Sequence, residues 1–186
     1  MTNSHFVIAL GLFLTGCGSN LSESTGGSPG LPASKVEFFY GDGTVKGPYG
    51  EDYGTTKTVA QRAIDPATSS ASEDVVSVSS GQPAREFVVS YAINGSKFTM
   101  VEKNGAFTGT GELVGEAWRW NEWRSHAILA HDQGTVDSDD HENGTTLDAT
   151  KTYYQADGSV GAVISEHLEA ITYAEFETRR AELLKP

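Results

Sequence analysis

One stretch of the chain concentrates the side chains that could bind a small molecule. Residues 115–131, GEAWRWNEWRSHAILAH, contain all three tryptophans, two arginines and two histidines. If the stretch is a strand, Trp118 and Trp120 share one face and Arg119 lies on the other, because successive side chains alternate. Ligand pockets combine apolar walls with a few placed polar groups. The stretch therefore predicts a pocket for an apolar ligand, with a carboxylate held by arginine or histidine, formed by Trp118, Trp120, Arg119, Arg124 and His126.

The same stretch also fits a simpler interpretation. It can be a core strand whose tryptophans pack together and whose arginines are solvated. Trp123 breaks the alternation that Trp118 and Trp120 set, which predicts a β-bulge near residues 121–122. Bulges often redirect side chains beside binding sites, but they also occur in ordinary strands. Both interpretations stay open at this level.

Other chemistry finds little support in the sequence. The chain has no Gly-x-Ser-x-Gly elbow and no phosphate-binding loop. The acidic segment 137–144 has calcium-loop spacing from Asp139, but Thr150 stands where an EF-hand needs glutamate. We interpret that segment as a solvated hairpin loop. His126 and His131 are five residues apart, on opposite faces of a strand, so they form no zinc pair. We predict no catalytic residue, no metal site and no cofactor, which favours a protein that is not an enzyme.

The only cysteine, Cys17, follows an apolar run over residues 6–14. That run is too short to span a bilayer, which needs about 20 apolar residues, and it fits the core of a signal peptide. The sequence LTGC at 14–17 resembles the bacterial lipobox. The resemblance implies a signal peptide over 1–16, cleavage before Cys17 and lipidation of its thiol. Because Gly18 rather than Asp follows, it also implies a place in the cell envelope, at the outer membrane and facing the periplasm.

A tether and one domain follow the cysteine. Residues 17–34 are rich in Ser and Gly with a single charge, Glu23. A flexible segment of this length has an r.m.s. reach of about 23 Å. Residues 35–186 are then expected to form a single domain. All 13 basic and 25 acidic residues lie beyond Cys17, so the net charge of −12 belongs to the mature protein. Such a charge repels phosphate backbones, so nucleic acid is not expected as a partner.

The strongest structural signals are two-residue turns. Three dipeptides favour the positive φ angles of hairpin turns, namely Asn94-Gly95, Asn104-Gly105 and Asp157-Gly158. The first predicts Ile93 opposite Ser96, and hence Tyr91 opposite Phe98. The flanking residues alternate between apolar and polar, which is typical of strands with one buried face.

The second and third turns predict further pairs across strands. Around Asn104-Gly105, Met100 should stand opposite Gly109 and Phe98 opposite Gly111. Around Asp157-Gly158, Tyr153 should pair with Ala162 and Leu147 with Leu168. Glycines facing bulky side chains indicate a strongly curved sheet or room for a neighbour.

These signals predict an all-β domain. Further strands are expected near 36–41, 54–62, 73–79 and 116–130, giving eight or more. An antiparallel meander of that size must close into a barrel, or double over as a β-sandwich, to hide its edges. Thr172 and Glu175 form a capping box, which predicts one C-terminal helix over residues 173–184, packed on the sheet as a lid or plug. The layout resembles the lipocalin and fatty-acid-binding (calycin) architecture.

Two functions from different classes fit this reasoning. One is a membrane-anchored lipoprotein whose barrel binds a small apolar or amphipathic ligand. The alternative is a non-enzymatic envelope structural or interaction protein whose barrel is filled, with protein partners that the sequence does not name. The third turn places Lys151 and Glu166 on the face of Tyr153 and Leu168. If that face is inward, the interior is partly polar, which favours the ligand-binding hypothesis.

Overall fold

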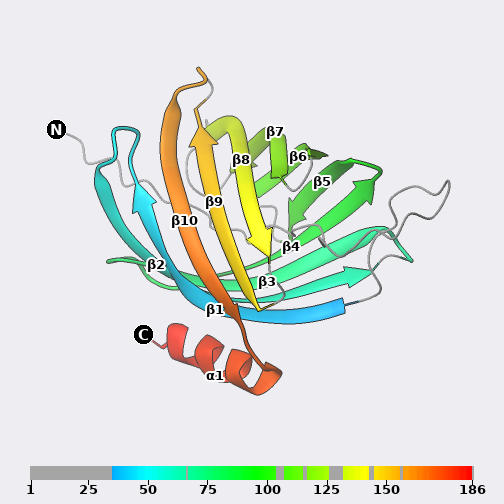
Figure 1. Cartoon of the computed structure of the whole chain (residues 1–186), viewed down its shortest axis with the longest axis vertical. Helices are drawn as coiled ribbons and strands as arrows, with labels where there is room; N and C mark the ends of the chain where they lie inside the picture. The colour runs from blue at the N-terminus through cyan, green and yellow to red at the C-terminus, as the bar shows by residue number, and fades with distance from the viewer. Residues whose placement is uncertain are drawn as a thin grey trace.

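The computed structural model describes residues 35–65, 67–103, 107–114, 117–125, 132–142, 145–155 and 157–185. Within these ranges the chain forms ten antiparallel strands and one helix (Figure 1). Their bounds are β1 Lys35–Lys46, β2 Asp52–Asp65, β3 Ser70–Ser79, β4 Arg85–Asn94, β5 Lys97–Glu102, β6 Phe107–Val114, β7 Ala117–Ser125, β8 Asp132–Glu142, β9 Thr146–Tyr154, β10 Val160–Ala170 and α1 Tyr173–Leu183.

The strands close into a barrel. Each strand pairs with its neighbour in sequence, and β1 pairs with β10 to complete the ring. This confirms the predicted all-β fold, an antiparallel meander that closes into a lipocalin-like barrel, and it excludes the β-sandwich. Closure leaves no strand of the ring with an unpaired edge, which is how such sheets avoid pairing with other chains.

The interior holds an apolar core. On β4 the burial alternates as predicted, with Phe87, Val89 and Tyr91 buried. They join a cluster that includes Phe98 and Met100 of β5, as well as residues from β1, β2, β3, β9 and β10. Successive side chains of a strand point to opposite faces of the sheet, so every second residue of each strand lies on the inner side.

Two of the three predicted registers are confirmed. Met100 stands opposite Gly109, and Tyr153 stands opposite Ala162. The register at Asn94-Gly95 was wrong by two residues, because Asn94 itself pairs with Lys97 and the loop consists of Gly95 and Ser96. Gly95 has φ +62°, so the glycine takes the first loop position. A shift of two residues leaves every side chain on its predicted face, so the apolar pattern could not distinguish the two registers.

The helix begins and ends close to the prediction. Thr172 caps it, and the capping box with Glu175 is formed in both directions. It lies outside the barrel, against the outer face of β1, β2 and β3, so it is not a lid or plug in the barrel end (Figure 1). Phe176 is buried there against Val59 and Val76, whereas Tyr173 is 59% exposed. No helix in the described part of the chain is long and apolar enough to cross a membrane.

The acidic segment differs from its prediction. Residues 137–142 belong to β8 rather than to a hairpin loop. The strand pairs on both sides, with β7 and β9, and Asp139 stands opposite Thr150 of β9. Pairing on both sides supplies the backbone hydrogen bonds that a strand needs, so tertiary context overrides the weak strand propensity of aspartate.

Candidate functional site

A polar cluster lies inside the barrel. Lys151 of β9 and Glu166 of β10 are both buried, with exposed fractions of 0% and 4%. The Lys151 Nζ atom lies 2.5 Å from Glu166 Oε2. The face that carries this pair also carries the buried residues Tyr153 and Leu168, as the register of the Asp157-Gly158 turn predicts. That face is therefore inward, and the barrel interior is partly polar.

Hydroxyl groups extend the cluster to the opposite strands. Thr58 of β2 donates a hydrogen bond to Glu166 Oε1, with 3.1 Å between the oxygens. Ser77 of β3 lies 3.2 Å from the Thr58 hydroxyl. Because Thr58 gives its only proton to Glu166, Ser77 is the donor of this second bond. The cluster thus runs from β9 to β3 across the inner wall.

A glycine on β1 allows the Glu166 side chain of β10 to contact β2. Gly43 of β1 stands between Glu166 of β10 and Thr56 of β2 in the register. A Cβ atom on Gly43 would lie 2.5 Å from Thr56 Oγ1 and 2.9 Å from Glu166 Cγ. The missing side chain therefore leaves the space through which the Glu166 carboxylate reaches β2.

Two further groups complete the described cluster. Thr56 is buried, and its hydroxyl has no hydrogen-bond partner among the described residues. The phenol of Tyr153 lies on the same face. Burial, together with the negative charge of Glu166, raises the pKa of Tyr153 well above its ordinary value. The phenol therefore stays protonated and can act as a hydrogen-bond donor.

Other charged groups lie inside the barrel as well. The Arg62 guanidinium is buried, pairs with Glu37 at 2.5 Å and lies over the Phe39 ring. The Tyr91 hydroxyl donates to Glu73, with 2.9 Å between the oxygens. Each of these groups has a polar partner, as buried polar groups require.

Residues 117–125 of the tryptophan-rich stretch form β7. Its register against β6 places Trp120 opposite Gly111 and Trp123 opposite Gly109. The register shifts between Trp120 and Trp123, which confirms the predicted bulge. Gly109 and Gly111 are buried on the inner face. Two of the tryptophans therefore stand opposite glycines, which have no side chain.

The other predicted ligand-binding residues fall at different register positions. Arg119 stands opposite Glu112, and Arg124 stands opposite Thr108. These alternate with the positions of the tryptophans. The side chains of Trp118, Arg119, Trp120 and Arg124 lie outside the described residues, and so do His126 and Cys17 as a whole. A ligand site formed by these residues, and lipidation of Cys17, stay predictions.

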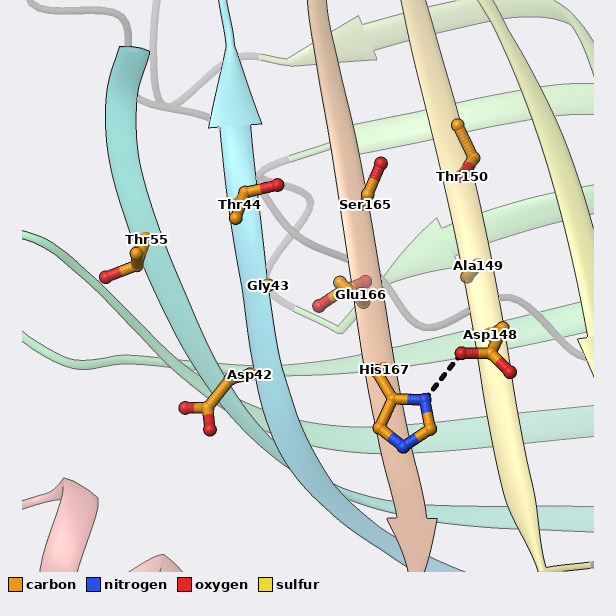
Figure 2. A pocket seen from close by; sticks show the side chains of 10 residues that line it. All are labelled: Asp42, Gly43, Thr44, Thr55, Asp148, Ala149, Thr150, Ser165, Glu166 and His167. Carbon is orange, nitrogen blue, oxygen red and sulfur yellow. Dashed lines mark hydrogen bonds and ion pairs between the residues drawn. The ribbon is translucent and has the colours of Figure 1, made fainter.

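The outer wall carries a groove of about 620 Å³. Figure 2 shows its side chains on β1, β2, β9 and β10. Its lining includes the hydroxyl groups of Thr44, Thr55, Thr150 and Ser165. His167 Nδ1 lies 2.5 Å from Asp148 Oδ1 at one end of the groove.

Asp148 changes the pKa of His167, but Ser165 is not placed to act with this pair as a nucleophile. The hydrogen bond and the negative charge of Asp148 raise the pKa of His167 above its ordinary value. Ser165 lies two residues before His167, on the same face. The second ring nitrogen points away from Ser165, however, so these three residues form no catalytic triad (Figure 2). Among the described residues, no group of three or more His, Cys, Asp or Glu side chains could hold a metal ion.

Comparison with known proteins adds no assignment. No protein-family model matches the chain, and no curated protein is significantly similar to it in sequence.

Sequence reasoning found part of the interior cluster and missed the rest. The Asp157-Gly158 register located Lys151 and Glu166, and the same register pairs Asp148 with His167. The predicted register could therefore have located the Asp148–His167 pair on the outer face as well. Thr56 and Thr58 gave no signal, because their place near Gly43 and Glu166 depends on barrel closure.

Proposed function

We propose that this chain is a bacterial envelope lipoprotein whose β-barrel binds a small apolar or amphipathic ligand. The observation that carries the proposal is the Lys151–Glu166 pair inside the barrel. Replacing a buried ion pair by apolar side chains is often neutral or stabilising, so such a pair is weak support for a purely structural role. In a ligand-binding site, the pair would orient the polar end of an amphipathic ligand.

The interior also supplies an apolar environment for the rest of such a ligand. Val45, Val75 and Phe87 belong to the same inward-facing core as the polar cluster. Trp120 and Trp123 of β7 stand across from Gly111 and Gly109 of β6 in the register, and β7 belongs to the closed ring of strands around this interior. An apolar wall with one polar cluster is the usual composition of a small-molecule site.

The lipoprotein part of the proposal rests on the LTGC sequence at 14–17. We assign residues 1–16 to the signal peptide, Cys17 to the lipid attachment and 17–34 to a tether that holds the barrel beside the outer membrane. Several acyl chains give stable attachment, whereas a single chain binds only marginally. Cells that express the full chain and receive radioactive palmitate should label it. A Cys17→Ala variant should stay unlabelled, and labelling of that variant would refute the anchor.

A second function, an envelope interaction protein with a filled barrel, is favoured by close packing. Val75, Val89 and Ile164 on the inner face are each 0% exposed. Dense packing of this kind is typical of an interior without a ligand space. The two functions differ in one measurable property, saturable binding of an apolar molecule.

A fluorescence titration distinguishes them. The purified full chain is mixed with N-phenyl-1-naphthylamine, a probe whose fluorescence emission rises when it moves from water into an apolar environment. We expect saturable binding at one site per chain, reversed by a lipid extract of the bacterial envelope. Linear, unsaturable emission at all protein concentrations would instead support the filled barrel.

A further inference from the structure

We propose that the barrel ligand carries an uncharged hydroxyl group, which hydrogen-bonds Thr56 beside the Lys151–Glu166 pair. The ligand class is a long-chain alcohol or a monoacylglycerol rather than a free fatty acid. This inference rests on the proposed function and specifies the chemistry of the same site.

Thr56 supplies the first observation. Its side chain is 2% exposed, and its hydroxyl has no hydrogen-bond partner among the described residues. The great majority of buried polar side-chain atoms in proteins have a partner, so a buried hydroxyl of this kind requires an explanation. A bound group that donates to or accepts from Thr56 Oγ1 provides it.

The position of Thr56 gives the second observation. Its Oγ1 atom would contact a Cβ atom on Gly43 at 2.5 Å, and Gly43 is buried on the inner face. The same Cβ atom would lie 2.9 Å from Glu166 Cγ. The hydroxyl is therefore directed toward the inner side of β1, next to the ion pair, rather than toward solvent.

Charge balance decides the class of polar group. Lys151 pairs with Glu166, and Arg62 pairs with Glu37, so both cations described inside the barrel already have a carboxylate. A fatty-acid carboxylate would bring a further negative charge into this interior, where Glu73 is buried too. Burying a charge without a new counterion costs far more than burying a hydrogen-bonded hydroxyl. An alcohol adds no charge and can both donate and accept.

The polar partners of Glu166 support the same choice. One carboxylate oxygen accepts from Thr58 and the other from Lys151. Glu166 therefore needs no cation from a ligand. Thr56 stands two residues before Thr58 on the same face of β2. A ligand hydroxyl at Thr56 extends the existing row of hydroxyl groups without disturbing the pair.

The test compares two molecules of equal chain length. The full chain, stripped of bound lipid, carries the naphthylamine probe, which is displaced by 1-decanol or by decanoate at pH 7.4. We expect 1-decanol to bind at least tenfold more tightly. Thr56→Val, which keeps the shape but removes the hydroxyl, should weaken 1-decanol binding about tenfold relative to binding of the probe, the worth of one hydrogen bond. Thr150→Val is the matched control, because Thr150 is exposed on the outer face of β9.

Each outcome decides a different claim. Equal or tighter binding of decanoate, or an unchanged 1-decanol affinity in Thr56→Val, overturns the hydroxyl proposal while ligand binding stands. Failure of the probe and of both lipids to bind saturably overturns the proposed function itself. If circular dichroism shows that Thr56→Val does not fold, Thr56→Ser keeps the hydroxyl and should keep the preference for the alcohol. Loss of that preference in Thr56→Ser contradicts the proposal.

Discussion

Glu166 of β10 accepts a hydrogen bond from Thr58 of β2, with 3.1 Å between the two oxygens, across the intervening strand β1. Side chains two strands apart are usually too distant to meet, because neighbouring strands lie about 4.8 Å apart. Gly43 removes the obstacle on β1. This contact connects the end of the chain to its beginning through the barrel interior.

Gly43→Ala should destabilise the barrel. The added methyl group would meet Thr56 Oγ1 at 2.5 Å and the backbone oxygen of Ser165 at 2.8 Å, so the strands must shift. We expect the free energy of unfolding to fall by about 1–3 kcal/mol, measured by urea denaturation. Gly161→Ala is the control, because its nearest neighbour there is the exposed Gln155 side chain at 3.3 Å. Equal stability of Gly43→Ala and the wild type would contradict the tight contact.

The buried ion pair should be strongly coupled. Lys151→Met leaves the Glu166 carboxylate buried without its cation, and we expect a loss of about 3–5 kcal/mol in the free energy of unfolding. The double variant Lys151→Met with Glu166→Leu removes both charges and should recover much of that loss. A double-mutant cycle from chemical denaturation measures the coupling. Additive effects of the two single substitutions would mean that the pair does not interact.

Asp74, on the outer face beneath α1, should make stability depend on pH. Its Oδ1 atom is buried without a hydrogen-bond partner in the described chain. Burial chiefly raises the pKa of Asp74 above 3.8, and Arg180 partly opposes this. The unfolded state therefore ionises first, and the free energy of unfolding falls as pH rises from near 3.8 through the raised pKa.

Asp74→Asn should remove that decrease. The variant should gain stability relative to the wild type above the raised pKa and show no such gain near pH 3. Thermal unfolding at a series of pH values measures the difference. Glu86→Gln is a useful comparison, because Glu86 is exposed and pairs with Arg180 at 2.7 Å. A pH-independent difference between Asp74→Asn and the wild type would rule out the titration of Asp74.

His167 should titrate above its ordinary range. Asp148 raises the pKa of His167 through a hydrogen bond and its charge. This pair therefore adds stability that is fully present below about 6.5 and is lost as pH rises through the raised pKa. In an NMR titration, Asp148→Asn should lower the pKa of His167. Asp42→Asn should change it less, because the Asp42 side chain points away from His167 and pairs with Lys57 (Figure 2). Identical titration in both variants would contradict the pairing.

The sequence predicted local pairings better than distant ones. The Asp157-Gly158 turn determines which residues of β9 and β10 face each other, so Lys151 and Glu166 could be placed on one face. Whether that face is inward depends on closure of the barrel. A lysine and a glutamate among aromatic and aliphatic residues do not by themselves indicate a direction.

The contacts of β1 with β10 could not be predicted from the sequence. Gly43 stands opposite Glu166, more than a hundred positions away, and no turn joins β1 to β10 to set their register. Thr56 and Thr58 enter the cluster only through that pairing. The error at Asn94-Gly95 has a local cause, because two registers that differ by two residues bury the same side chains. Turn chemistry alone separates them.

Mass spectrometry of the intact protein tests the central claim, a ligand inside the barrel, most directly. The full chain is purified in mild detergent and measured under native and then denaturing conditions. The covalent lipid that we propose on Cys17 would contribute equally to both masses, so only a bound ligand changes the difference between them. We predict one additional small molecule per chain in the native spectrum, lost on denaturation and reduced in Thr56→Val. Equal native and denatured masses in repeated preparations would contradict the account.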